Sequence, residues 1–186
     1  MPTNKAAIIP SSGVRPLQLI TRPYPSPTAG TLVVRTHALA INPLDHLIQT
    51  QGTALIDLAG VVQEIGAGVT RFKVGDRVVA HATGTDKERN DPAMGAFQEF
   101  VVVQEIMCCP VPENMSFEQA AVVPMGVSTA AAGLWQDDML KLKPPSAKSP
   151  GFTQTDAAKR IVLITGGASS VALTPSNLPL QLATRS

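Results

Sequence analysis

The sequence predicts a mainly β domain, either a barrel or a sandwich, followed by a few helices and an incomplete α/β segment. Up to about residue 114, short apolar segments alternate with turn residues at close spacing. After Asn114 the pattern changes to small residues at helical spacing, and "IVLITGGASS" (161–170) then combines a β-branched run with glycines. Hydrophobic residues make up 44% of the chain and charged residues 16%, which is typical of a folded globular protein.

The predicted strands share apolar or alternating patterns and are bounded by Gly, Pro or Asp. They are "KAAII" (5–9), "PLQLI" (16–20), "TLVVRTHALAI" (31–41), the strands within "AGVVQEIGAGVTRFKVGDRVVAHA" (59–82), and "AFQEFVVVQ" (96–104). Gly66 and Gly68 suit a tight turn, because glycine adopts positive φ angles at little cost. A second turn is predicted at Gly75.

Two helices are predicted after the strands. "SFEQ" at 116–119 matches a capping box, with Ser116 at the N-cap and Gln119 three residues later. We expect a break at Pro124 and a second helix from about Gly126 to Trp135. The Pro-rich stretch after it is expected to be a linker, and "IVLIT" (161–165) a buried strand.

Charge and cysteine content limit the classes of function. The net charge of +1 gives no electrostatic reason to expect nucleic acid or an anionic membrane as a partner. Cys108 and Cys109 are adjacent, so on a strand they point to opposite faces and favour packing over a redox or metal pair. No secretory signal or membrane-length apolar run is found, and we expect a soluble, cytoplasmic protein.

Five stretches together resemble the medium-chain dehydrogenase/reductase superfamily. The resemblance is closest to its zinc-independent enoyl reductase and quinone reductase branch, which includes fungal "zinc-binding alcohol dehydrogenase domain-containing" proteins. The stretches occur in the family's order, and the second is the most specific. They are "ALAINPLD" (38–45), "DLAGVVQEIGAGVTRFKVGDRVVA" (57–80), "GAFQEFVVV" (95–103), "MSFEQAAVVPMGVSTAAAGL" (115–134) and "VLITGGASSV" (162–171).

The resemblance implies a domain plan and an activity. It implies a GroES-like catalytic domain at 1–125, a hinge helix and linker at 126–159, and the start of a Rossmann NAD(P)-binding domain at 160–186. NADPH would lie between the two domains and pass hydride to a small molecule: an enoyl, a quinone or a related conjugated carbonyl. The protein's part in such chemistry is to orient the reactants, exclude water and stabilise charge.

The resemblance also implies site residues. Asn42 falls where zinc alcohol dehydrogenases carry a metal-binding cysteine, and asparagine is a poor zinc ligand, so we expect no catalytic metal. Asn42 would instead contact the nicotinamide or the substrate; the alternative is an Asn-Pro turn. Thr129 matches a threonine near the nicotinamide, or else it is a buried threonine bonded to its own helix. We expect a structural role for Asp45, which either is solvated or caps a helix.

A glycine loop at the start of a helix binds pyrophosphate through backbone N–H groups. The expected cofactor-binding residues are Gly166, Gly167, Ser169, Ser170 and Val171. Pro175 and Pro179 fall where the first crossover helix should run, and each would remove a helical hydrogen bond. We therefore expect an incomplete Rossmann segment, doubtful activity, and no NADPH binding by this chain at micromolar concentration.

Two other functions remain open. One is a non-catalytic GroES-like module that binds a partner or forms a homodimer through an exposed strand. The other is a zinc-dependent alcohol dehydrogenase. His46, beside Asp45, is either a proton donor or a solvated surface histidine, and surface or structural positions are favoured for His37 and His81.

Overall fold

The computed structural model describes residues 3–11, 14–51, 56–84, 91–142, 164–166 and 169–171. The chain divides into two compact units, Met1–Pro124 and Met125–Ser186. The two units are described separately below.

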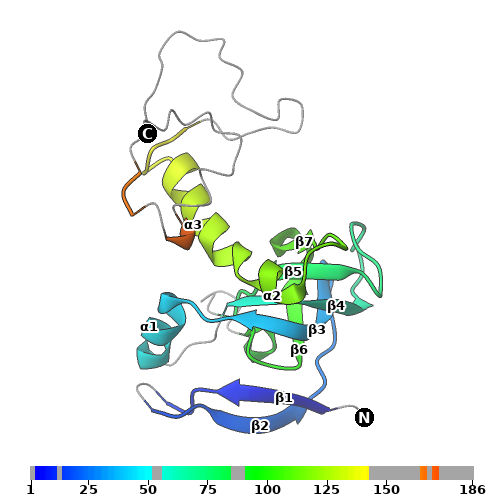
Figure 1. Ribbon diagram of the computed structural model, residues 1–186. Helices are drawn as coiled ribbons and strands as arrows, with labels where there is room; N and C mark the ends of the chain where they lie inside the picture. Colours follow the sequence, from blue (N-terminus) through cyan, green and yellow to red (C-terminus); the bar gives the residue numbers. More distant parts are fainter. Residues whose placement is uncertain are drawn as a thin grey trace. The chain divides into compact units, whose positions relative to one another are not determined.

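The first unit is built from two antiparallel sheets (Figure 1). The smaller pairs β1 (Thr3–Ile8) with β2 (Gln18–Pro23). The larger has the order β6-β3-β4-β5-β7 and only antiparallel pairs. Its strands are β3 (Thr31–Ala40), β4 (Asp57–Ile65), β5 (Arg77–His81), β6 (Phe100–Gln104) and β7 (Cys108–Pro110). This architecture confirms the predicted mainly β domain.

The small sheet is joined to the larger one through a buried asparagine. The side chain of Asn4 donates to the carbonyl of Phe100 at 2.8 Å and accepts from its N–H at 3.0 Å. It also donates to Gln98 Oε1 at 3.0 Å, and Ala6 forms a bridge with Gln98. Asn4 thus satisfies backbone groups of β6 that would otherwise lie unpaired at a buried sheet edge. Nearby, the ring of Tyr24 meets that of Phe100 edge-on, with centroids 4.9 Å apart.

The pairing of β3 with β4 needs a glycine. The register shifts twice along this pair, between Val33 and Val34 and between Thr36 and Ala38. Near the second shift, a Cβ on Gly60 would overlap the carbonyl oxygen of Arg35, far inside contact distance. Any other residue would therefore force the two strands apart. Gly68, in the turn after β4, has a φ of 79°, and Gly75, in the turn before β5, has a φ of 93°, as predicted. Gly66 does not have the expected positive φ, and glycine is needed there because a Cβ would overlap the Thr28 carbonyl oxygen.

Three helices and two 3₁₀ turns complete the described residues. They are α1 (Pro43–Gln51), η1 (Pro92–Met94), η2 (Glu105–Met107), α2 (Phe117–Ala121) and α3 (Val123–Trp135). The predicted capping box is confirmed, because Ser116 and Gln119 exchange both side chain–backbone bonds. Apolar side chains of α2 pack against the sheet beside Ala38, Ala59 and Val111.

Arg77 fastens the segment before α2 to β5. Its guanidinium donates to the carbonyls of Pro112, Glu113 and Met115 at 3.3, 3.1 and 2.6 Å, and lies 4.6 Å from the ring centroid of Phe117. We call this set of contacts the Arg77 anchor. Most of the guanidinium's N–H donors therefore bind backbone carbonyls that accept no hydrogen bond within a strand or helix.

Two details of the sequence prediction are wrong. The helix expected from Gly126 begins three residues earlier, at Val123, because Pro124 occupies its first turn, where no N–H is needed. Ile164 and Thr165, expected to end a strand, are not in one; residues 161–163 lie outside the described residues. Most of the expected Rossmann segment also lies outside them.

Within the second unit, α3 ends at Trp135, and the buried indole Nε1 of this residue finds no hydrogen-bond partner among the described residues. Cys108 and Cys109 of β7 are free thiols, the first buried and the second exposed, as their adjacent positions predict. Burial raises the pKa of the Cys108 thiol to about 12. No helix in the described part of the chain has the length and apolar character needed to cross a membrane.

Candidate functional site

A polar cluster lies at one end of the five-stranded sheet. Strand β3 ends at Ala40, β4 begins at Asp57 and β5 ends at His81, and the register places these three residues side by side across the strands. Asn42 follows β3 by two residues and precedes α1. Antiparallel pairing therefore brings together residues from three separate segments of the sequence.

Asn42 is held by two carboxylates. Its side-chain Nδ2 donates to Asp57 Oδ2 at 2.9 Å, and its backbone N–H donates to Asp45 Oδ2 at 2.6 Å. The N–H of Asp45 in turn donates to the Asn42 carbonyl at 2.9 Å. Asn42 immediately precedes Pro43, the first residue of α1. The Asp45 side chain, in the first turn of α1, accepts from the backbone N–H of Asn42 and so caps the helix. The turn alternative and the site alternative for Asn42 are both compatible with this geometry.

Asp57 is the residue that sequence reasoning missed. Its side chain is fully buried, and its Oδ1 lies 3.4 Å from Nδ1 of His81, which is partly exposed. A carboxylate in a dry interior is costly unless charged or hydrogen-bonding groups surround it. The sequence signal was a single acidic residue inside the apolar run "LIDLAG". We call Asn42, Asp45, Asp57 and His81 the Asn42 cluster.

Asp45 is buried rather than solvated, so one of its two expected placements is wrong. Burial raises the pKa of its carboxyl group, the bond from Asn42 opposes this, and the charge of Asp57 raises it further. The expected structural role, capping a helix, is what the geometry shows.

Thr129 lies on α3 in the second unit, whereas Asn42 lies in the first. Its hydroxyl is exposed and contacts the sulfur of Met125 at 3.6 Å, so the buried-threonine alternative is wrong. Ser128, the preceding residue, is the one that bonds back to its own helix, at the Met125 carbonyl. The expected role of Thr129 beside the nicotinamide remains a prediction.

The described part of the glycine loop has features that a pyrophosphate-binding turn requires. Gly166 has a φ of 70°, a conformation that favours glycine, and a Cβ there would meet nothing within 4 Å. Its carbonyl accepts from the N–H of Ser169 at 2.9 Å, and a helical turn begins at Ser170 and Val171. Gly167 lies outside the described residues. The N–H of Ser169 is thus bonded within the chain, and cofactor binding stays a prediction.

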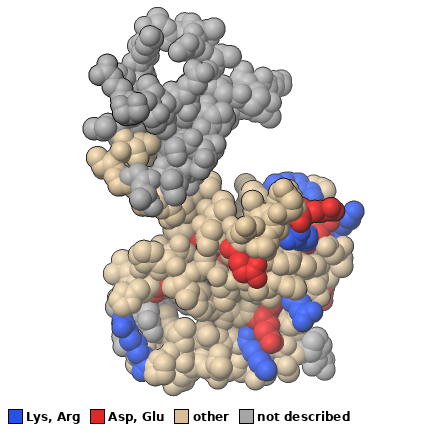
Figure 2. Space-filling view, viewed as in Figure 1, with Lys and Arg blue, Asp and Glu red and all other residues tan. Residues whose placement is uncertain are grey.

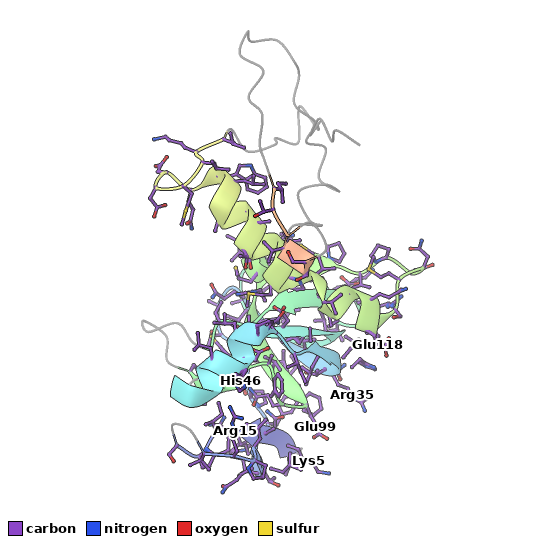
Figure 3. All side chains as sticks on the ribbon, turned by 60° about the vertical axis from the view of Figure 1, so that its left-hand side comes forward. Lys5, Arg15, Arg35, His46, Glu99 and Glu118 are labelled. Atoms are coloured by element: carbon purple, nitrogen blue, oxygen red, sulfur yellow. The ribbon has the colours of Figure 1, made fainter. Side chains whose placement is uncertain are left out.

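The remaining histidines lie on the surface. His46 on α1 is exposed, and Nη2 of Arg15 lies 3.2 Å from its Nδ1 (Figure 3). His37 is exposed and stacks on Phe117 with centroids 4.8 Å apart. On the face seen in Figure 2, acidic and basic side chains are interspersed rather than gathered by sign. Among the described residues, no group of three or more His, Cys, Asp and Glu could hold a metal ion.

Comparison with known proteins identifies the domain that carries this site. Residues 28–113 match the family described as "Alcohol dehydrogenase GroES-like domain". The fold is similar to that in a crystal structure of an alcohol dehydrogenase superfamily protein from Novosphingobium aromaticivorans, with a TM-score of 0.71 and 23% identity over 96% of this chain and 52% of that one. The chain therefore carries an alcohol dehydrogenase GroES-like domain at residues 28–113, and its fold is similar to that of a member of the alcohol dehydrogenase superfamily.

Two curated relatives with similar sequences come from fungi. The chain is 44% identical to the dehydrogenase pigH of Monascus ruber over 92% of its own length, and 34% identical to the trans-enoyl reductase grgB of a Penicillium species over 91%. It spans about half the length of the curated relatives it matches, with 48% of pigH and 46% of grgB covered. These comparisons confirm the resemblance stated from the sequence.

Proposed function

We propose that this chain provides the substrate-facing domain of an NADPH-dependent reductase that acts on an enoyl, a quinone or a related conjugated carbonyl. The observation that carries the proposal is the Asn42 cluster: a carboxamide held by buried carboxylates at the end of a GroES-like sheet. Relatives named as trans-enoyl reductases support the reaction class.

The chain's own residues orient the reactants in this proposal. The Asn42 carboxamide hydrogen-bonds the small molecule or the nicotinamide, and the apolar sheet behind it keeps water away. The backbone around Gly166, Ser169, Ser170 and Val171, together with the Thr129 hydroxyl, would hold the cofactor. When bound, NADPH supplies the hydride, so the protein needs no nucleophile of its own.

A zinc-dependent mechanism fits this site poorly. The Asn42 Nδ2 donates to Asp57, and a protonated amide nitrogen is not a metal ligand. Metal analysis of the purified protein tests this: one equivalent of zinc that resists dialysis would favour the alcohol dehydrogenase alternative. For the binding-module alternative, sedimentation is the measurement, since a cofactor-independent dimer without turnover would support it.

The reductase proposal is tested with a chimera. This chain is joined to the part of the M. ruber pigH dehydrogenase that it does not match, and NADPH oxidation is followed with a panel of enoyl thioesters and quinones. We expect turnover of at least one class, and a decrease in kcat of about 100-fold in Asn42→Ala. Asn114→Ala, at an exposed turn, is the matched control and should leave kcat unchanged. Turnover by none of the panel, or equal turnover by both variants, would refute the proposal.

The chain by itself gives a second test. The expectation from its sequence is that the purified protein does not bind NADPH at micromolar concentration, and titration calorimetry measures this directly. Binding in that range would overturn the expectation and would show that the glycine loop at 166–171 is functional as it stands.

A further inference from the structure

We propose that Asp57, supported by His81, is a positioning residue that fixes the side-chain amide of Asn42 in one of its two flip orientations. One consequence is that a bound ligand would face Oδ1 of Asn42 rather than Nδ2, and this consequence rests on the proposed function. The positioning itself does not, because it is a property of the Asn42 cluster alone.

The chemistry of the partners decides the orientation of the amide. An ionised carboxylate only accepts hydrogen bonds, whereas an asparagine side chain has an acceptor Oδ1 and a donor Nδ2 that can exchange places by rotation about Cβ–Cγ. With Nδ2 turned to Asp57 the contact is a charge-assisted bond of 2.9 Å. With Oδ1 turned there instead, two oxygens would face each other in a buried site, which is repulsive.

The backbone of Asn42 is fixed as well. Its N–H donates to Asp45 and its carbonyl accepts from the N–H of Asp45, so rotation of the whole residue is restricted. Only the side-chain torsions remain, and the bond from Nδ2 to Asp57 restrains those, with the Asp45 carboxyl group also interacting with this side chain. Because Nδ2 faces the carboxylate, Oδ1 lies on the other side of the Cβ–Cγ axis and points away from Asp57. A ligand group that meets Oδ1 must therefore carry an N–H or O–H donor.

His81 supports the carboxylate of Asp57. The register pairs the two residues directly, and Nδ1 lies 3.4 Å from Oδ1. The other oxygen of the carboxylate, Oδ2, is the one that accepts from Asn42. The two oxygens of one buried carboxylate thus face a histidine and an asparagine, so a change at His81 alters the charge environment of the group that accepts from Asn42.

The experiment is NMR on the full 186-residue chain labelled with ¹⁵N. The Asn42 side-chain amide is assigned by its loss in Asn42→Ala. We expect one Nδ2 proton shifted downfield and exchanging with water about tenfold more slowly than those of the exposed Asn114. Exchange is measured on the unaltered chain, and only the assignment of the signal uses a variant. Equal exchange at Asn42 and Asn114 would overturn the proposal.

Variants then assign the effect to residues. Asp57→Asn keeps the volume but removes the charge, and we expect the Asn42 proton to move upfield. His81→Gln should move it in the same direction by less, and His37→Gln, at an exposed histidine of the same sheet, should not move it. An unchanged Asn42 signal in a folded Asp57→Asn protein, or equal changes in His81→Gln and His37→Gln, would contradict the proposal.

Turnover by the chimera separates this inference from the proposed function. A positioning role predicts that Asp57→Asn lowers kcat by up to about 100-fold while KM changes little. If the amide signal behaves as expected and the chimera has no turnover, the reductase proposal fails and the positioning stands. If turnover persists unchanged in Asp57→Asn, the positioning of Asn42 has no catalytic consequence and that part of the inference is refuted.

Discussion

The Asn42 cluster and the Arg77 anchor each include residues of the strand pair β4 and β5, and they use polar side chains in different ways. Asp57 pairs with His81 at one end of it, and Val61 pairs with Arg77 at the other. Arg77 donates hydrogen bonds to three backbone carbonyls, and its guanidinium lies over an aromatic ring. In the Asn42 cluster, no described residue donates to Oδ1 of Asn42. A polar group whose capacity is spent on the backbone stabilises the fold, whereas one held in place with capacity to spare can bind a ligand.

The largest expected effect on stability comes from a substitution that disrupts the pairing of β3 with β4, which supports both regions. In Gly60→Ala the new Cβ overlaps the Arg35 carbonyl, so β3 and β4 must separate and the free energy of unfolding falls by about 3 kcal/mol. Urea denaturation measures it. Gly133→Ala on α3 is the control, because a Cβ there meets nothing within 4 Å and alanine favours helix. A Gly60→Ala protein as stable as the wild type would show that the register of β3 and β4 is wrong.

The next effect distinguishes the two regions. Arg77→Met keeps the length of the side chain but loses three hydrogen bonds to carbonyls, so we expect the free energy of unfolding to fall by about 2 kcal/mol. The Asn42 amide signal should stay where it is. Arg22→Met, which loses a single bond to Pro92, should cost less. A shifted Asn42 signal in Arg77→Met would mean that the two regions are not independent.

The capping box of α2, like the Arg77 anchor, is expected to contribute to stability rather than to ligand binding. Ser116→Ala removes the acceptor for the N–H of Gln119, and the expected loss in unfolding free energy is about 1 kcal/mol. Ser128→Ala, in the interior of α3, removes only a bond to its own helix carbonyl and should change stability less. Equal losses in the two variants would argue against a specific cap.

The smallest effect belongs to the Asn42 cluster and depends on pH. Because the pKa of Asp45 is raised in the folded state, the folded protein binds more protons than the unfolded chain between the unfolded and the folded pKa. Stability should therefore fall as pH rises through that window. Asp45→Asn keeps an acceptor for Asn42 and should flatten this part of the profile, whereas the exposed Asp137→Asn should not. Urea denaturation at several pH values decides between them, and parallel profiles would refute the assignment.

Local chemistry explains why part of this structure could be predicted. Gly68 and Gly75 terminate strands through their own φ preference, and Ser116 with Gln119 caps α2 within four residues. The predicted start of α3 is wrong because proline usually interrupts a helix, whereas the first helical turn tolerates Pro124. Helix α1 was not predicted as such, since Asn42-Pro43 also fits a turn.

The candidate site was predicted only in part, because its contacts join distant segments. Asn42 was singled out, but its partner Asp57 lies 15 residues away, and β5 supplies His81 from farther still. Which residue faces which depends on the register of β3, β4 and β5, and the two shifts along β3 cannot be read from alternating hydrophobicity. The available signal was Asp57, a lone acidic residue in an apolar run, which indicates a buried carboxyl group but not the residues that it contacts.

Tyr24 and Trp135 have a practical consequence for studying this chain. Each is the sole residue of its type, and Tyr24 belongs to the first compact unit and Trp135 to the second. Burial raises the pKa of Tyr24 to about 12, with Glu64 contributing, so its absorbance reports on that unit up to strongly alkaline pH. Tryptophan fluorescence can be excited separately from tyrosine. The protein therefore carries one natural optical label on each unit, and the two melting curves can be recorded from a single unmodified sample.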